Sequence, residues 1–447
     1  MDGGQSLDHA LDEVPFGRPH VWILVTLALI GLIEAYATGM TGVLVVAAKS
    51  SLQMPVSDVP WLVIAPTGSL IAGGLACAVY FQDRVSRKTL LLIGVIWSCV
   101  FTLVTAGAAT VSQLLVIRVL SGFGYGLALP AAYPIGAEGM PPKRRSTAGW
   151  VYEASLGTGL TLVFVAAAAL VHSPEGWRVV PLPSALMLVI LPLLIVKKIP
   201  ESPRWLMSRG RTGAAWSVVN RARAQAGLDK VVATAAPADR PHPATPLATL
   251  VQPGNLSHLV LAITVYTCAT VPFYVFSTLM PALLIRQGFA EVASFAFTVL
   301  LFAVTIPGKI LNGFLMEALG RQKTIALALT TSLIALALGV ADPSSLGFTS
   351  MEVLLGLSVL SSYPAVRMYM VEQFPTERRG RGYFMAEMVG RFLAGVMVSF
   401  VLASHLADPG VIYGAIAAFA IVGAGAPLVY GRKDTRGPLM PTAEAPL

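Results

Sequence analysis

Long apolar runs alternate with short polar connections along almost the whole chain. Each run holds about 20 residues, the length of helix that crosses the hydrocarbon core of a bilayer. The runs are continuous and do not alternate with polar residues, so they predict membrane-spanning helices and not barrel strands. Six runs come first, at 21–47, 59–81, 89–108, 112–136, 148–171 and 179–198, and six follow, at 257–283, 291–318, 323–341, 349–372, 382–406 and 410–431.

A polar segment separates the two sets of runs and suggests the organisation of an all-α, polytopic membrane protein with 12 transmembrane helices. The expected parts are an N-terminal tail at 1–20, a six-helix bundle at 21–198, a central loop at 199–256, a second six-helix bundle at 257–431 and a C-terminal tail at 432–447. The stretch PRWLMSRGRTGAAWSVVNRARAQ in the central loop predicts amphipathic helix against the membrane surface. Pro272 and Pro281 predict bends in the seventh span, which suit an outer gate.

The basic residues predict which side of the membrane each connection faces. The chain has 31 lysines and arginines, and most of those between the spans fall on one side. Only Lys49, Arg178 and Arg286 fall on the other side. Because basic connections face the cytoplasm, both termini are expected there, in a cell membrane such as a bacterial inner membrane. The net charge of +8 reflects this bias, so nucleic acid is not an expected partner.

Composition supports the membrane assignment and narrows the function. Charged residues make up 12% of the chain, against roughly 25% in soluble domains. Cys77, Cys99 and Cys268 all lie in apolar runs, without the spacing of a disulfide framework or a zinc site. The sequence contains no HExxH, GxSxG or Walker-type loop, which argues against an enzyme and against an ATP-driven pump. No cofactor and no metal are expected.

Charged stretches recur in the two halves at one constant offset. QDRVSRK (82–88) corresponds to MEALGRQK (316–323), which pairs Asp83 with Glu317 and Arg87 with Arg321. At the same offset, EGMPPKRRSTAGWVYE (138–153) corresponds to EQFPTERRGRGYFMAE (372–387). So many rare charges in one register indicate a duplicated six-helix unit.

These motifs resemble the major facilitator superfamily of secondary transporters. VYFQDRVSRK (79–88) and GFLMEALGRQK (313–323) are similar to its loop motif, and RVLSGFGYG (118–126) to its helix 4 motif. PESPRWLMSRGR (200–211) is similar to sequences of the sugar-porter and organic-ion branch, which includes metabolite–proton symporters. The resemblance implies two pseudo-symmetric six-helix bundles around a solute cavity that opens alternately to either side.

The loop charges are expected to form a gate in such a fold. Asp83 and Glu317 are expected at helix N-termini, where a negative charge is favourable. Arg84, Arg87 and Arg321 are expected to pair with acids of the opposite half. The expected ion pairs join Arg87 to Glu387 and Arg321 to Glu153, and direct substrate contact is the alternative.

Charged residues within the spans mark the candidate site, since a charge at that depth needs a partner or a function. Glu34 lies near the middle of the first span, and we expect it to take up and release the coupling proton with Arg118 as its partner. A purely structural Glu34–Arg118 ion pair is the alternative. Aromatic-acid symporters resemble this region but carry a second acid three residues later, where this chain has Ala37.

Arg391 and Arg367 are candidates for binding an anionic substrate, because guanidinium suits a carboxylate. An internal Glu387–Arg391 pair is the alternative, since the two residues lie four apart on one helix face. Lys309 and Arg367 are also candidates for gating or snorkelling. Five tyrosines are candidates for the cavity wall, with plain packing as the alternative: Tyr36, Tyr125, Tyr152, Tyr266 and Tyr274.

The sequence therefore predicts a monomeric transporter whose partners are the lipid bilayer, a small solute and a proton. Uptake of a small organic anion, such as an aromatic carboxylate, is the favoured function. A proton-driven exporter of drugs or metabolites, a sugar or polyol carrier and a non-transporting sensor or scaffold remain alternatives. The fifth and seventh spans contain no Gln or Asn, which disfavours a sugar carrier.

Overall fold

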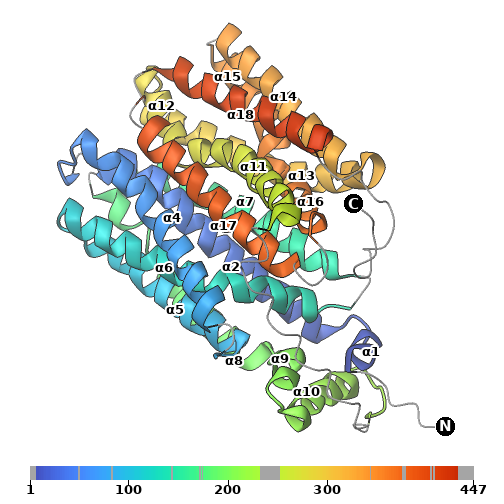
Figure 1. Cartoon of the computed structure of the whole chain (residues 1–447). Helices are drawn as coiled ribbons and strands as arrows, with labels where there is room; N and C mark the ends of the chain where they lie inside the picture. The colour runs from blue at the N-terminus through green and yellow to red at the C-terminus, as the bar shows by residue number, and fades with distance from the viewer. Residues whose placement is uncertain are drawn as a thin grey trace.

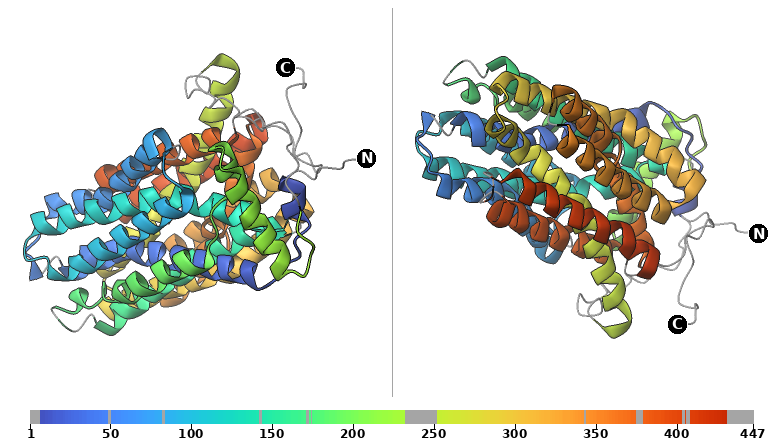
Figure 2. Two further views of the ribbon diagram at one scale, coloured as in Figure 1. Left: turned by 90° about the horizontal axis from the view of Figure 1, so that it is seen from below. Right: turned by 90° about the horizontal axis from the view of Figure 1, so that it is seen from above.

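The computed structural model describes residues 7–48, 51–81, 84–141, 144–170, 173, 175–231, 252–342, 344–374, 379–402, 405 and 408–430. All regular secondary structure within these ranges is helical. Twelve helical segments are long and apolar enough to cross a membrane, which confirms the predicted class and the predicted number of spans. The spans run side by side as one elongated bundle (Figures 1 and 2).

The first six spans lie close to the apolar runs that predicted them. They are α2 (Arg18–Val43, continued by the π-helical η1, Leu44–Ala48), α4 (Val59–Ala76, continued by η3, Cys77–Phe81), α5 (Arg87–Val104), α6 (Val111–Glu138), α7 (Arg145–Leu170) and α8 (Pro183–Lys198). Short side chains cap two of the starts. Ser86 Oγ accepts the Thr89 N–H at 3.1 Å before α5, and Thr110 Oγ1 accepts the Gln113 N–H at 3.2 Å before α6.

Two of the last six spans are interrupted. The seventh consists of α11 (Pro253–Tyr274), the π-helical η8 (Val275–Leu279) and α12 (Met280–Arg286), and the tenth of α15 (Ser345–Leu357), η9 (Val359–Ser361) and α16 (Tyr363–Glu372). The others are α13 (Glu291–Leu319), α14 (Arg321–Ala341), α17 (Arg379–Val396, continued by η10, Met397–Leu402) and α18 (Pro409–Tyr430).

Helices of the same half make most of the contacts. In the first half α2 packs against α7, while α6 packs against α4 and α5. In the second half α11 packs against α17 and α18, and α14 packs against α15 and α18. Small residues allow the closest approaches, as they do in membrane bundles generally. A Cβ atom on Gly126 of α6 would lie 2.1 Å from the Leu70 carbonyl oxygen of α4, so only glycine fits there.

The halves meet mainly where α7 packs against α13, where α4 packs against α17 and η10, and where α2 packs against η8. The polar interior of the protein lies along this seam, because buried charged side chains of α7, α13, α16 and α17 meet there. The fold therefore places a site between the halves and away from lipid.

The central segment forms two short helices, α9 (Pro203–Ser208) and α10 (Thr212–Gln225), so helix there is confirmed. The apolar side chains Trp216 and Val219 of α10 pack against Ala10 of α1 (Leu7–Asp12). Arg223 Nη1 also lies 2.5 Å from Glu13 Oε2. Figure 1 shows α1, α9 and α10 together at one end of the bundle.

Candidate functional site

A cavity lies between the two halves, lined by α2, α7, α11, α13, α16 and α17. We call it the central cavity. Its free space, including the part that is continuous with solvent, is about 590 Å³. Its charged lining residues are Glu34, Glu153, Lys309, Arg367 and Arg391.

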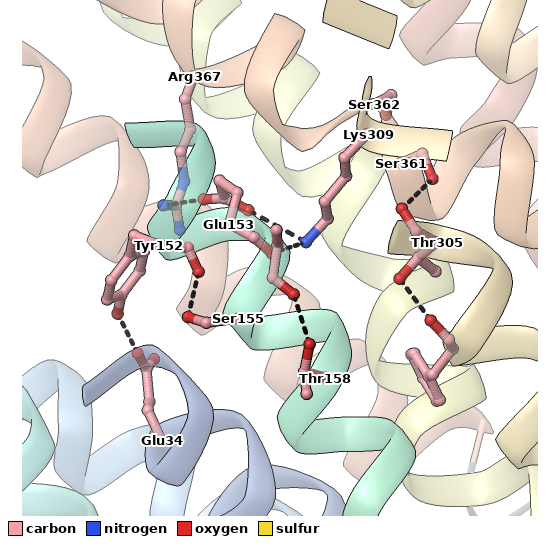
Figure 3. Close-up of polar contacts among 12 residues, drawn as sticks. Glu34, Tyr152, Glu153, Ser155, Thr158, Thr305, Lys309, Ser361, Ser362 and Arg367 are labelled. Atoms are coloured by element: carbon pink, nitrogen blue, oxygen red, sulfur yellow. Dashed lines mark hydrogen bonds and ion pairs between the residues drawn. The ribbon is translucent and has the colours of Figure 1, made fainter. Parts of the chain in front are cut away.

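Glu153 on α7 binds two cations from the opposite half of the protein. Arg367 Nη1 donates to Glu153 Oε1, and Lys309 Nζ lies 3.5 Å from Glu153 Oε2 and also donates to the Glu153 carbonyl. All three side chains are buried. Figure 3 shows Glu153 between the two cations. This cluster is an ionic link between the halves.

Glu387 on α17 completes the network of ion pairs beside the central cavity. Its Oε1 accepts from Arg391 Nη2 at 2.9 Å, from Arg367 Nη2 at 3.2 Å and from the Tyr266 hydroxyl at 3.2 Å. The Glu387–Arg391 pair, given above as the alternative to anion binding by Arg391, therefore forms in this structure. Arg367 binds Glu387 and Glu153 at once, so one guanidinium joins an acid of each half.

Glu34 is buried on α2 and accepts a hydrogen bond from the Tyr152 hydroxyl of α7. The predicted ion pair with Arg118 is wrong. Arg118 Nη2 instead donates to the Ala37 carbonyl and to Thr41 Oγ1, both at 2.8 Å. These acceptors lie about one and two turns further along α2, so the Arg118 guanidinium is past the level of Glu34.

Neighbouring residues of α7 connect the Glu34 site to the link between the halves. Tyr152 points toward Glu34 in its own half, whereas Glu153 points toward Lys309 and Arg367 in the other half (Figure 3). A shift of α7 therefore acts on Glu34 and on the ionic link together.

The tyrosine predictions divide three ways. Tyr266 and Tyr274 line the central cavity, as predicted. Tyr125 lines a second, adjoining cavity. Tyr36 and Tyr152 are not among the residues that line either cavity: the Tyr36 hydroxyl donates to the Val180 carbonyl at 2.8 Å, and the Tyr152 hydroxyl donates to Glu34.

Sequence reasoning missed Tyr363, which lines the central cavity. Its ring centre lies 6.0 Å from the Arg367 guanidinium. A signal was present, because Tyr363 stands one helical turn before Arg367 and residues four apart share a face. Thr270 and Thr305 also line the cavity and were not predicted.

The predicted gate pairs are wrong. Glu153 and Glu387 stand about two turns inside α7 and α17, where the buried cations bind them, and the loop residues Arg87 and Arg321 do not reach them. Arg321 Nη2 instead lies 3.2 Å from Glu372 Oε1, within its own half.

Of the remaining predicted gate residues, the structure describes the side chain of Arg84 but not those of Asp83 and Glu317. The Arg84 guanidinium stacks 3.9 Å from the centre of the Tyr80 ring. Asp83 lies outside the described residues. Glu317 belongs to α13, but its side chain is also outside them.

Twelve candidate spans around a cavity with a buried, charged lining are the architecture of a multi-pass membrane transporter. Residues 27–398 match the Major Facilitator Superfamily, and the chain belongs to that superfamily of secondary transporters. Membership places it among transporters and not among enzymes, as the sequence predicted.

Known relatives cover nearly the full length of the chain. The niacin transporter of Acinetobacter baylyi is 26% identical, over 88% of this chain and 90% of its own. The gallate transporter of Pseudomonas putida is 27% identical, over 86% of this chain and 85% of its own. The fold matches a partially occluded, inward-open structure of the xylose transporter XylE from E. coli with a TM-score of 0.74 at 16% identity. That match covers 94% of this chain and 99% of XylE.

Proposed function

We propose that the protein carries a small monocarboxylate and a proton together across the membrane. The observation that supports this most directly is the charge balance at the central cavity. Three acids (Glu34, Glu153 and Glu387) face three cations (Lys309, Arg367 and Arg391). One proton on Glu34 leaves the site with one positive charge in excess, which a single carboxylate neutralises.

The pairing of these charges explains why Glu34 is the candidate for the proton. Glu153 and Glu387 are each held by two cations, so their ionised forms are compensated. Glu34 has a tyrosine hydroxyl as its hydrogen-bond partner. A buried carboxylate without a cation in contact is the one that a proton most readily neutralises.

Aromatic side chains around the cations suit an aromatic cargo. Tyr266, Phe273, Tyr274 and Tyr363 line the central cavity, where their rings offer apolar and edge-to-face contacts. Arg391 and Lys309 supply the charge for a carboxylate. Two relatives are named for niacin and gallate, which are aromatic carboxylates, and this agrees with the chemistry of the lining.

Transport would follow from alternating access around this site. A proton on Glu34 removes the negative charge that faces Arg391, and Arg391 then accepts the cargo carboxylate. With both ligands bound the cavity is neutral, so the halves can rock without moving net charge. Tyr152 and Glu153 would transmit the state of Glu34 to the Glu153–Arg367 link.

Uptake into proteoliposomes under an imposed pH gradient tests the proposal. Nicotinate, gallate and benzoate are offered together with the neutral compounds nicotinamide and xylose. We expect at least one carboxylate to accumulate when the outside is acidic and the neutral compounds not to. In Glu34→Gln, accumulation should fall to the level reached without a gradient while exchange of cargo at equal pH persists.

Glu175→Gln serves as the matched control, because Glu175 is an exposed acid that contacts Arg178 away from both cavities. It should behave as the wild type does. Accumulation of xylose or nicotinamide in preference to every carboxylate contradicts the proposal. So does undiminished pH-driven accumulation by Glu34→Gln.

A further inference from the structure

A second cavity adjoins the central one, between α2, α4, α6, η8 and α17. We call it the outer cavity, because it lies toward the end of α2 that is expected to face outside. Thr38, Tyr274 and Arg391 line both cavities, so the two cavities are immediate neighbours. Glu34, Thr38 and Thr41 stand on successive turns of one face of α2 and lead from one cavity to the other.

Arg118 lines the outer cavity with unused hydrogen-bonding capacity. Its side chain is 1% exposed, and Nη2 uses both of its hydrogens on Ala37 and Thr41. Within the part of the chain that the structure describes, Nε and Nη1 have no hydrogen-bond partner, which leaves three of the five guanidinium N–H groups unsatisfied. Leaving such donors buried and unpaired costs about 1–3 kcal/mol or more.

Arg118 also lacks a counter-charge. Among the described residues no acidic side chain forms an ion pair with it, and the acids nearest the cavities are bound to other groups. A buried arginine in a membrane protein is expensive and normally marks a partner or a pathway. The partner that is missing here is an anion with oxygen acceptors.

We propose that Arg118 forms an outer subsite, where the carboxylate of the cargo docks before it moves to Arg391 in the central cavity. The idea rests on the proposed function, since it assumes a carboxylate cargo. The carboxylate would accept from Nη1 of Arg118, while Tyr125 and Tyr274 flank the body of the cargo. Arg391, which lines both cavities, is the next cation along the path.

The subsite makes a different prediction from a proton-coupling role for Arg118. A group that binds cargo affects the affinity for cargo even when no gradient is present. A group that acts only on the proton affects accumulation driven by pH and leaves exchange at equal pH intact. The apparent KM for exchange therefore separates the two roles.

Exchange of labelled nicotinate and benzoate at equal pH on both sides provides the test, with Arg118→Gln, Arg118→Lys and the exposed control Arg286→Gln. Loss of a charge-assisted contact should raise the KM of Arg118→Gln for the transported carboxylate about 10- to 100-fold. Arg118→Lys keeps the cation and should lie between Arg118→Gln and the wild type. Arg286→Gln should match the wild type.

The outcomes distinguish this subsite from the proposed function. If the wild-type protein exchanges neither of these carboxylates, nor labelled gallate, both proposals fail. If it does exchange one and Arg118→Gln keeps the wild-type KM, the subsite is refuted while carboxylate transport stands. If Arg118→Gln loses only pH-driven accumulation, Arg118 serves the proton and the subsite is again refuted. Should Arg118→Gln not fold, as judged by gel filtration, an unchanged KM in Arg118→Lys refutes the subsite and a raised KM supports it.

Discussion

Glu352 on α15 is fully buried, and neither of its carboxyl oxygens has a hydrogen-bond partner among the described residues. It is not among the residues that line the central or the outer cavity. An unsatisfied buried polar group costs stability, and replacing it with an apolar side chain of similar size removes that cost.

Glu352→Met should therefore stabilise the protein. The expected gain is about 1–3 kcal/mol of unfolding free energy, read as a rise of at least about 2 °C in the melting temperature of the detergent-purified protein. Glu387→Gln is the contrasting variant, because Glu387 is bound by Arg367 and Arg391, and it should lower the melting temperature. A lower melting temperature for Glu352→Met would show that its carboxyl has a structural role.

At the residue scale, the sequence predicted which charged residues belong to the site, but it did not predict which residues they contact. A charge inside an apolar run is conspicuous, so Glu34, Arg367 and Arg391 were found from sequence alone. Their partners depend on which helices adjoin and on how each helix is rotated. Glu34 therefore meets Tyr152 and not Arg118, a choice that spacing along one chain does not encode.

At the scale of the elements, the contact between α2 and η8 closes one end of the seam. A Cβ atom on Gly42 would lie 2.7 Å from the Ser277 carbonyl oxygen and 3.3 Å from Thr278 Cα. The obstacle is backbone, so it cannot move aside as a flexible side chain would. A larger residue at Gly42 is compatible only with separated helices.

Gly42→Val should therefore hold α2 away from η8 and favour the state that is open at this end. The rate of exchange should fall severalfold, and a cysteine placed at Ser277 should react faster with a hydrophilic maleimide. Gly68→Val is the matched control, because a Cβ atom at Gly68 has open space around it. Unchanged exchange and labelling in Gly42→Val would mean that this contact does not have to form in the cycle.

The apolar pattern predicted the spans to within a few residues but not their interruptions. Hydropathy averages over a window, whereas the change from α11 to η8 depends on the hydrogen bonds of a single turn. Only the prolines gave a local signal. Helix α11 gives way to η8 just after Pro272, as the expected bend in the seventh span suggests, since proline lacks the donor of a regular turn.

At the scale of the whole molecule, the ionic link through Arg367 lies deep in the seam and the predicted loop pairs do not form. The duplication correctly indicated equivalent acids at Glu153 and Glu387. It did not indicate that Lys309 and Arg367 bind these acids, because the equivalent positions of the first half hold the uncharged residues Leu75 and Tyr133. An internal sequence repeat predicts which residues occupy equivalent positions in the two halves. The ion-pair partners of those residues depend on how the two halves pack against each other.

The distribution of basic residues predicts the orientation of the protein in the membrane, and cysteine labelling can test this prediction. The three native cysteines are buried, so single cysteines introduced at exposed connections report with little background. Arg211 lies just before α10 and Ala290 just before α13, and both are exposed. The positive-inside bias predicts that Arg211 lies in the cytoplasm and Ala290 outside.

In intact cells, a membrane-impermeant maleimide should therefore label Ala290→Cys, and it should label Arg211→Cys only after permeabilisation. The reasoning depends on an odd number of spans between the two positions, since α11 with η8 and α12 forms one span. Labelling of both sites in intact cells would mean that this segment does not cross the membrane. The reverse pattern would invert the topology, and Arg118 would then stand on the cytoplasmic side of the central cavity, at the exit for incoming cargo instead of the entrance.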